Sequence, residues 1–265
     1  MKMKMIFADM DGTLCDENGK VNDKTIHSIQ EVIRNGYMFV VATGRSIDRI
    51  IPSFFQTPLS YIIALNGSQI YDVENKKLLF ENAINYLTCK MIYEEAKKYQ
   101  LEILLDVGLT RYSNTINSDR EKLDDSVFSS FKDKKISQFV LSGNYQSLMK
   151  IKKVIETFSD VTVINQSKDL LYQDNTYPTK YSFIDVVSSS TSKGNSITWL
   201  LNYLNVSKDY TIALGDGIND LSMFDNVSIK VAMGNSESYL KEKADVITLS
   251  NSENGASYYL DSLLK

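Results

Sequence analysis

Three apolar segments of the sequence share one layout, in which a run of strand length stops abruptly at small or acidic residues. These segments read MIFAD, YMFVVATG and TIALGDG. The polar residues at or just beyond their ends are Asp9, Asp11, Thr43, Gly44, Asp216, Asn219 and Asp220. In an open parallel α/β sheet, ligands bind beyond the carboxyl ends of the strands. We therefore expect these side chains, from both ends of the chain, to face one pocket.

Four of these side chains are carboxylates, and their charges decide what the pocket requires. Clustered carboxylates repel one another and raise each other's pKa unless cations compensate. Hard oxygen ligands without histidine or cysteine favour Mg²⁺ over zinc or copper. The single histidine, His27, falls off the apolar face of a predicted surface helix and is expected to be solvated. The pattern thus indicates a magnesium site.

Lys193 is the second candidate cation. It opens a predicted helix over 193–204, where the helix dipole disfavours a positive charge. A nearby aspartate together with a bound phosphate would offset that cost. The alternative is a solvated lysine, tolerated at a cost of roughly a few tenths of a kcal/mol.

The elements that position these residues are typical of a Rossmann-like α/β fold. Unbroken apolar strands imply burial on both faces, as in a parallel sheet covered by helices, and SIKVAMG and ADVITL look like further strands of that sheet. Between the first two strands, apolar residues at helical spacing predict a helix over 22–36, with Asp23 as its cap and Gly36 as its end. These segments form one βαβ unit.

The middle of the chain is expected to form a separate, inserted domain. Strands such as LEILLDV, KISQFVLSG and YSFIDVV alternate there with helices and have no acidic endings. We assign residues 84–187 to an inserted α+β domain, and residues 1–83 with 188–265 to the catalytic core. The segment SSSTS at the exit suits a hinge, and an ordinary exposed loop explains it equally well.

The overall composition limits the classes of partner. The chain has 265 residues, 43% of them hydrophobic, and a net charge of −4, so no global positive field attracts nucleic acid or an anionic membrane. No segment has the length of a signal-peptide core or of a membrane span. The two cysteines, Cys15 and Cys89, lack metal-ligand spacing and are expected to be reduced thiols. We predict a cytoplasmic protein, and the oligomeric state stays open.

Four motifs occur in the order found in the haloacid dehalogenase superfamily. The run DMDGTL after an apolar strand resembles the first motif, ATGR the second, SKGNSI the third and GDGIND the fourth. Together with Asn66 in LNGSQIYD and the insertion between the second and third motifs, they resemble the Cof-type hydrolases, which carry a large α/β (type IIB) cap. The resemblance covers essentially the whole chain.

The resemblance implies a magnesium-dependent phosphatase that forms an aspartyl-phosphate. Asp9 would attack phosphorus while Asp11 protonates the leaving oxygen, and Asp11 would then activate the water that releases phosphate. The groups implied to hold phosphoryl oxygens are Thr43, the Gly44 amide, Asn66, Asn219 and Lys193, of which Lys193 would also neutralise Asp9. The implied Mg²⁺ ligands are Asp9, the main-chain oxygen of Asp11 and Asp216, with Asp220 either a further ligand or a supporting group.

Single residues of these motifs also have other interpretations. The run DMDGTLCDENGKV suggests a calcium loop, but an EF-hand needs glycine at its sixth position, whereas Gly12 is fourth from Asp9. Without the family pattern, Thr43 could be an ordinary strand end and Asn66 a turn former. Cys15 lies beside the first motif, and an acid-rich neighbourhood would raise the pKa of its thiol, which favours a packing role over a nucleophilic one.

The expected substrates are small phosphorylated metabolites, sugar phosphates or related organophosphates first. One alternative is a phosphomutase on the same scaffold, because transfer from Asp9 to a second hydroxyl needs no new core residue. Another is a module that binds phosphorylated metabolites without turnover. The presence of both Asp9 and Asp11 argues against such a module, since binding alone needs no acid aligned with a leaving group.

Overall fold

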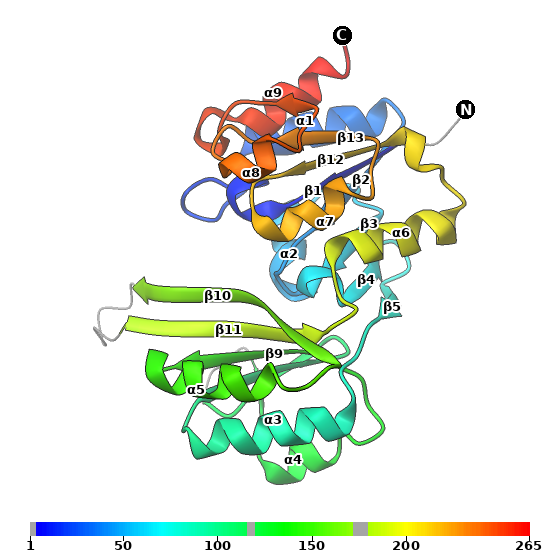
Figure 1. The fold of residues 1–265 in the computed structure, drawn as a ribbon. Coiled ribbons are helices and arrows are strands. Elements are labelled where there is room, and N and C mark those ends of the chain that lie inside the picture. Colours follow the sequence, from blue (N-terminus) through cyan, green and yellow to red (C-terminus); the bar gives the residue numbers. More distant parts are fainter. Residues whose placement is uncertain (1–3, 116–119, 172–179) are drawn as a thin grey trace. The chain divides into compact units, whose positions relative to one another are not determined.

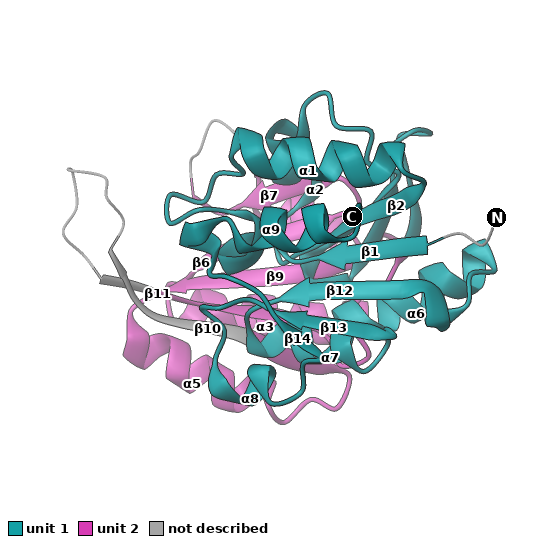
Figure 2. Ribbon diagram, turned by 90° about the horizontal axis from the view of Figure 1, so that it is seen from above, with its two compact units in different colours: residues 1–80, 192–265 teal, residues 81–191 magenta. Residues whose placement is uncertain are grey.

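The computed structural model describes residues 4–115, 120–171 and 180–265 (Figure 1). The chain separates into two compact units, which Figure 2 colours differently. Unit 1 consists of Met1–Phe80 and Ser192–Lys265, and unit 2 is Glu81–Thr191. Unit 2 is therefore an insertion into unit 1, and its role as the cap implied by the resemblance stays a prediction.

Unit 1 is built on an eight-stranded sheet with the order β14-β13-β12-β1-β2-β3-β4-β5. Neighbouring strands from β14 to β3 run parallel, and β4 is antiparallel to β3. The strands are β1 (Lys4–Ala8), β2 (Tyr37–Ala42), β3 (Tyr61–Ala64), β4 (Gln69–Asp72), β5 (Lys77–Glu81), β12 (Thr211–Gly215), β13 (Ile229–Ala232) and β14 (Val246–Ile247). The predicted α/β class with a parallel sheet is confirmed.

The central strands are apolar over most of their length because helices cover both faces of the sheet. Alternate residues of β1 enter two separate cores, with Ile6 in one and Phe7 in the other. The first core is covered by α1 (Asp23–Arg34), α2 (Ile47–Ile50) and α9 (Gly255–Ser262). The second is covered by α6 (Lys193–Leu204), α7 (Leu221–Phe224) and α8 (Ser238–Lys241). A rigid two-sided sheet thus fixes the strand ends that carry the polar residues.

The helix between β1 and β2 begins one residue earlier than its predicted cap implies. Asn22, not Asp23, caps α1, because the Asn22 side chain accepts a hydrogen bond from the backbone amide of Thr25. At the other end, Gly36 follows the helix with φ +87°, a conformation that glycine adopts without strain. The expectation for Asp23 is therefore wrong by one position, and that for Gly36 is confirmed.

Unit 2 contains a six-stranded sheet with the order β10-β11-β9-β6-β7-β8, antiparallel except for the β7–β8 pair. Its strands are β6 (Glu102–Val107), β7 (Thr110–Ser113), β8 (Glu121–Lys122), β9 (Ile136–Gly143), β10 (Val161–Leu171) and β11 (Lys180–Ser188). Its helices are α3 (Tyr86–Lys98), α4 (Asp125–Ser129) and α5 (Tyr145–Ile155). They enclose an apolar core of their own. The unit has the α+β composition expected from its sequence.

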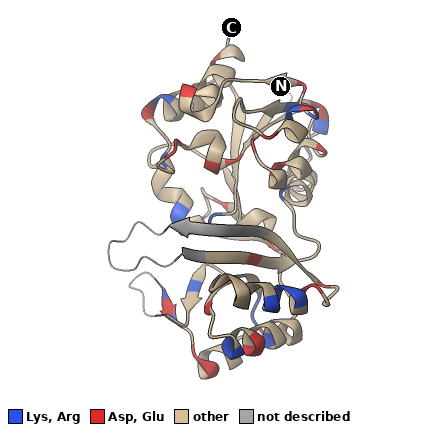
Figure 3. Cartoon of the chain, turned by 60° about the vertical axis from the view of Figure 1, so that its left-hand side comes forward, with Lys and Arg blue, Asp and Glu red and all other residues tan. Residues whose placement is uncertain are grey.

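Charged side chains are distributed over both units. Figure 3 shows basic and acidic residues interspersed in that view, on unit 1 as well as on unit 2.

Among the described residues, no helix combines the length and the apolar composition needed to cross a membrane.

Candidate active site

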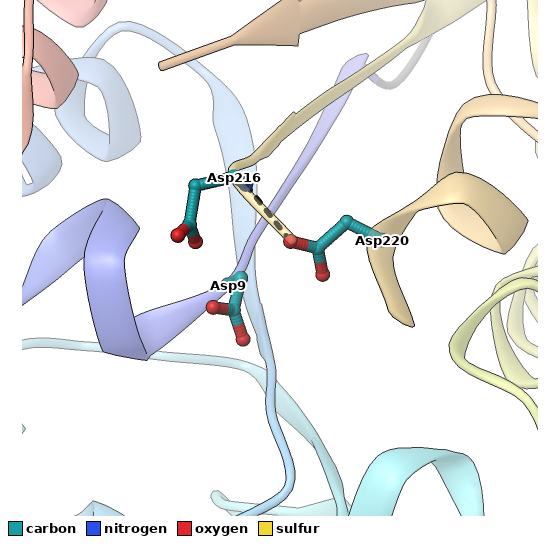
Figure 4. Close-up of side chains that lie close together, drawn as sticks. All are labelled: Asp9, Asp216 and Asp220. Atoms are coloured by element: carbon teal, nitrogen blue, oxygen red, sulfur yellow. Dashed lines mark hydrogen bonds between the residues drawn. The ribbon is translucent and has the colours of Figure 1, made fainter. Parts of the chain in front are cut away.

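Three aspartates meet at the carboxyl ends of neighbouring strands in unit 1. Asp9 follows β1, and Asp216 follows β12, which pairs with β1 in parallel register. Asp220 lies one short turn further on. Each of the three offers a carboxylate oxygen, and these oxygens all lie within 4.8 Å of one another (Figure 4). Residues from both ends of the chain therefore share one site, as expected for an open parallel sheet.

Lys193 lies inside this acidic cluster. Its Nζ donates hydrogen bonds to Oδ1 of Asp9 at 2.6 Å and to Oδ1 of Asp220 at 2.7 Å, and all three side chains are almost fully buried. Lys193 is the first residue of α6, which Ser192 caps by accepting from the Asn195 amide. The positive charge at a helix N-terminus is thus offset by two carboxylates.

A glycine brings the start of α6 close to the loop after β3. Gly67 has φ +105°, and a Cβ at this position would lie 2.3 Å from the carbonyl oxygen of Ser192. A side chain at position 67 would therefore push the start of α6 away and displace Lys193.

Burial disfavours ionisation of two carboxylates of the cluster, those of Asp9 and Asp216. It raises the pKa of Asp9 to about 8, although Lys193 acts in the opposite direction, and the charges of Asp220 and Asp216 add to the rise. Burial, followed by the charge of Asp220, raises the pKa of Asp216 to about 6. Burial alone would lower the pKa of Lys193, but Asp220 and Asp9 outweigh it and the pKa is raised. The site lacks positive charge.

The charge balance and the oxygen donors fit a divalent cation. Three carboxylates and one ammonium sum to −2 when all are ionised. Both oxygens of Asp220 already accept hydrogen bonds, Oδ1 from Lys193 and Oδ2 from the amides of Asp216 and Gly217 at 2.9 and 3.0 Å. Asp216 Oδ1 accepts from Thr13 Oγ1 at 3.0 Å. Asp9 and Asp216 are thus the better placed ligands, and Asp220 orients its neighbours.

The turn that follows β1 depends on a glycine. Gly12 has φ +80°, in the left-handed region. A Cβ on Gly12 would lie 2.2 Å from Oδ2 of Asp216, so any other residue would displace that carboxylate. Gly12 of the first motif therefore leaves room for the Asp216 carboxylate of the fourth.

Asp216→Asn should stabilise the protein when metal is chelated. The folded-state pKa of Asp216, about 6, lies above the ordinary value of 3.8, so its ionisation opposes folding, fully above about pH 6 and not at all below about pH 4. At about pH 8 with chelator, we expect a gain on the order of 1 kcal/mol in the free energy of unfolding, discounted for partial exposure. Urea denaturation measures this, and the gain should vanish as the pH falls towards 4.

Magnesium provides the control for this variant. Added Mg²⁺ should stabilise the wild type more than Asp216→Asn, because the asparagine removes a charged ligand. If Asp216→Asn were less stable than wild type at about pH 8 in chelator, ionisation of Asp216 would not destabilise the folded protein, and the prediction would be wrong.

A second group of predicted residues forms a polar corner next to the acidic cluster. Asn66 is buried and has φ +56°, and its backbone nitrogen donates to the Thr43 carbonyl oxygen at 2.9 Å. Asn219 Nδ2 donates to Oδ1 of Asn66 at 3.4 Å, whereas the buried Nδ2 of Asn66 has no hydrogen-bond partner. A Cβ on Gly44 would lie 2.9 Å from that same nitrogen. A buried unpaired donor favours an anionic ligand there.

The Asp11 carboxylate is not one of the three clustered carboxylates. It is exposed and forms a salt bridge with Arg45, whereas the acidic cluster found among the described residues contains Asp9, Asp216 and Asp220. The charge of Asp11 still makes a small contribution to the raised pKa of Asp216, and its place in the pocket stays a prediction. The guanidinium of Arg45 offers a better partner than a site already rich in carboxylates.

Arg45 is the residue that the sequence-based assignment overlooked. It is the last residue of ATGR, directly after the predicted Thr43 and Gly44. The signal available in the sequence was an arginine beside a predicted phosphate site, in a chain with clustered carboxylates. Guanidinium groups bind carboxylates and phosphates through two parallel hydrogen bonds.

Two other side chains behave as expected. Cys15 is buried, and this burial raises the pKa of its thiol to about 12, so it is not a thiolate nucleophile at neutral pH. His27 is exposed on α1.

The chain matches a family model described as haloacid dehalogenase-like hydrolase over residues 6–260. It is 28% identical over 295 residues to Phosphatase YwpJ of Bacillus subtilis, covering 99% of this chain and 100% of that protein. It is 27% identical over 284 residues to the 5-amino-6-(5-phospho-D-ribitylamino)uracil phosphatase YwtE of the same organism, covering 99% and 98%. Similarity thus extends over nearly the full length of both proteins.

A third relative is much longer than this chain. Endoribonuclease YBEY, chloroplastic, of Arabidopsis thaliana is 26% identical over 272 residues, which are 97% of this chain but only 46% of that protein. Among solved structures, a haloacid dehalogenase-like hydrolase from Bacteroides thetaiotaomicron superposes with a TM-score of 0.79 at 24% identity, covering 99% of this chain and 100% of that chain. This likeness shows a shared fold.

Proposed function

The chain belongs to the haloacid dehalogenase-like hydrolase family, and on that premise we propose that it is a magnesium-dependent phosphatase of small phosphorylated metabolites. The observation that carries the proposal is the buried Asp9 carboxylate, hydrogen-bonded to Lys193 and flanked by Asp216 and Asp220. Such a carboxylate can attack phosphorus, and the lysine can balance the charge of an incoming phosphate.

The reaction proceeds in two steps through this chain's own residues. Asp9 forms a bond to phosphorus while the bond from phosphorus to the ester oxygen breaks, and that oxygen takes a proton from Asp11. Water then attacks the aspartyl-phosphate and gives its proton to Asp11, which releases phosphate and restores Asp9. Lys193 stays on Asp9 throughout and neutralises the charge that develops on the phosphoryl oxygens.

The remaining residues hold the phosphoryl group. The unpaired side-chain nitrogen Nδ2 of Asn66 donates to the phosphoryl oxygens, together with the neighbouring Thr43 and Gly44. Asn219 holds the Asn66 side chain in place by donating to its Oδ1. Mg²⁺ would be held by Asp9, Asp216 and the main-chain oxygen of Asp11, and when bound it supplies the positive charge that the cluster lacks. Asp220 holds Lys193 and the amides after β12 in place.

The substrate class rests on family likeness and on the acidic, metal-fitting site. The related YwtE is named for a phosphate ester of a sugar-alcohol derivative. Sugar phosphates and related organophosphate monoesters are therefore the first compounds to test. The cytoplasmic location stays a prediction.

Chelation should abolish activity, and Mg²⁺ should restore it. We expect phosphate release from at least one ester in a panel of sugar phosphates and other metabolite monoesters, with a loss of at least about 100-fold in excess chelator. Free phosphate and the organic product are both quantified. Isomerised ester without free phosphate would identify a mutase, and tight binding with the ester unchanged after hours would identify a binding module. Full activity in chelator would contradict the magnesium assignment.

A further inference from the structure

Arg45 holds the Asp11 carboxylate at both oxygens. Its Nε donates to Oδ2 at 3.0 Å and its Nη2 donates to Oδ1 at 2.5 Å. The Asp11 side chain is 59% exposed, and that of Arg45 only 23%. A planar guanidinium that binds two oxygens at once restricts rotation of the carboxylate. The contact therefore limits where an exposed side chain can lie.

Arg45 is itself anchored by several contacts. Its backbone amide donates to Oγ1 of Thr43 at 3.2 Å, and its carbonyl oxygen accepts from the Leu65 amide at 3.1 Å. Its Nη2 also donates to the carbonyl oxygen of Gly19 at 3.1 Å, in the loop after the first motif. The guanidinium thus joins the end of β2 to Asp11 and to that loop, and it has little freedom to move away.

We propose that Arg45 is a positioning residue for the acid and base Asp11, which deepens the proposed function and rests on it. Asp11 gives its proton to the ester oxygen as the bond to phosphorus breaks and later takes a proton from water. Both carboxylate oxygens accept from Arg45 in the structure, so one of them gives up its hydrogen bond when it carries the proton, while the other stays on Arg45 and keeps the side chain in place. Without Arg45, Asp11 samples many rotamers in solvent, and few of them align with the leaving group.

Two esters with different leaving groups can distinguish a positioning role of Arg45 from a general contribution of Arg45 to the fold. An alkoxide leaving group needs protonation, whereas p-nitrophenolate is stable as an anion and leaves without an acid. The quantity to compare is kcat/KM, which covers the steps up to departure of the leaving group, because kcat also contains the second step, in which Asp11 acts as base for either ester. Arg45→Met should therefore lower kcat/KM for an alkyl phosphate ester by about 10- to 100-fold, and for p-nitrophenyl phosphate by less than about 3-fold.

Two further variants complete the experiment. Arg45→Lys keeps the charge but loses the two-pronged hydrogen bonding of the guanidinium, so its kcat/KM on the alkyl ester should lie between those of wild type and Arg45→Met. Arg49→Met, on the exposed side of α2, is the matched control and should behave as wild type. Equal losses of kcat/KM in Arg45→Met on both esters, or no difference from Arg49→Met, would overturn the inference.

The activity of the wild type shows whether a negative result counts against the proposed function or only against the role of Arg45. If the wild type hydrolyses neither ester with Mg²⁺, the proposed function fails and the role of Arg45 fails with it. If the wild type hydrolyses both and Arg45→Met shows no dependence on the leaving group, only the positioning role is lost.

Discussion

Asp9→Asn should lower phosphate release by at least roughly 10⁴-fold, since an amide oxygen cannot form the covalent phosphoryl intermediate. The substitution keeps the shape of the side chain and an oxygen that can accept from Lys193. It also removes a buried carboxyl whose pKa is raised to about 8, so the variant should fold at least as well as wild type in chelator at about that pH. Phosphate release and urea denaturation on the same preparations test both statements.

The phosphorylated intermediate gives a direct readout. Mass spectrometry of acid-quenched wild type during turnover should show one phosphoryl group on the peptide that contains Asp9, and none on the variant. Asp48→Asn, an exposed aspartate on α2, is the matched control and should keep wild-type activity. If Asp9→Asn kept substantial activity, the nucleophile would have to be another group.

Lys193→Met should destabilise the protein and remove most activity. Its Nζ is the buried partner of both Asp9 and Asp220, and removing one partner of a buried ion pair leaves charge uncompensated at a cost of about 3–5 kcal/mol. Loss of this donor at the phosphoryl group should cost kcat on the order of 10²- to 10³-fold. Urea denaturation and phosphate release under Mg²⁺ measure the two effects separately.

A second substitution separates charge from packing in this variant. Adding Asp220→Asn to Lys193→Met removes one of the two stranded carboxylates, so the double variant should recover part of the lost stability but none of the activity. Lys243→Met, at an exposed position after α8, should match wild type in both measurements. A Lys193→Met protein as stable as Lys243→Met would mean that the buried pair contributes little.

The two predictions depend on one feature, the shared burial of opposite charges. Asp9 and Lys193 are 184 positions apart in the chain but 2.6 Å apart at their charged atoms. Burial raises the pKa of Asp9 and so opposes formation of the attacking carboxylate, whereas the charge of Lys193 favours it. Lys193 stays protonated because its carboxylate partners outweigh the effect of burial. Changing either residue should alter both the chemistry and the stability of the cluster.

The elements of unit 1 were predictable because local sequence carries their signals. Unbroken apolar runs predict β1, β2 and β12 as buried parallel strands, and the predicted helix over 193–204 coincides with α6. The rule that parallel strand ends share an edge then placed Asp9 and Asp216 together. The single misplaced helix cap, Asn22 rather than Asp23, reflects two adjacent residue types that both cap helices well.

The directions of side chains were decided only by the tertiary structure. The sequence by itself determined which residues follow which strands, because strand periodicity and motif spacing are local properties. It did not determine that the Asp11 carboxylate lies on Arg45, that Asp220 uses both oxygens on Lys193 and backbone amides, or that the Asn66 amide lacks a partner. Each depends on segments brought together by packing, where burial and competing charges select one hydrogen-bond partner among several.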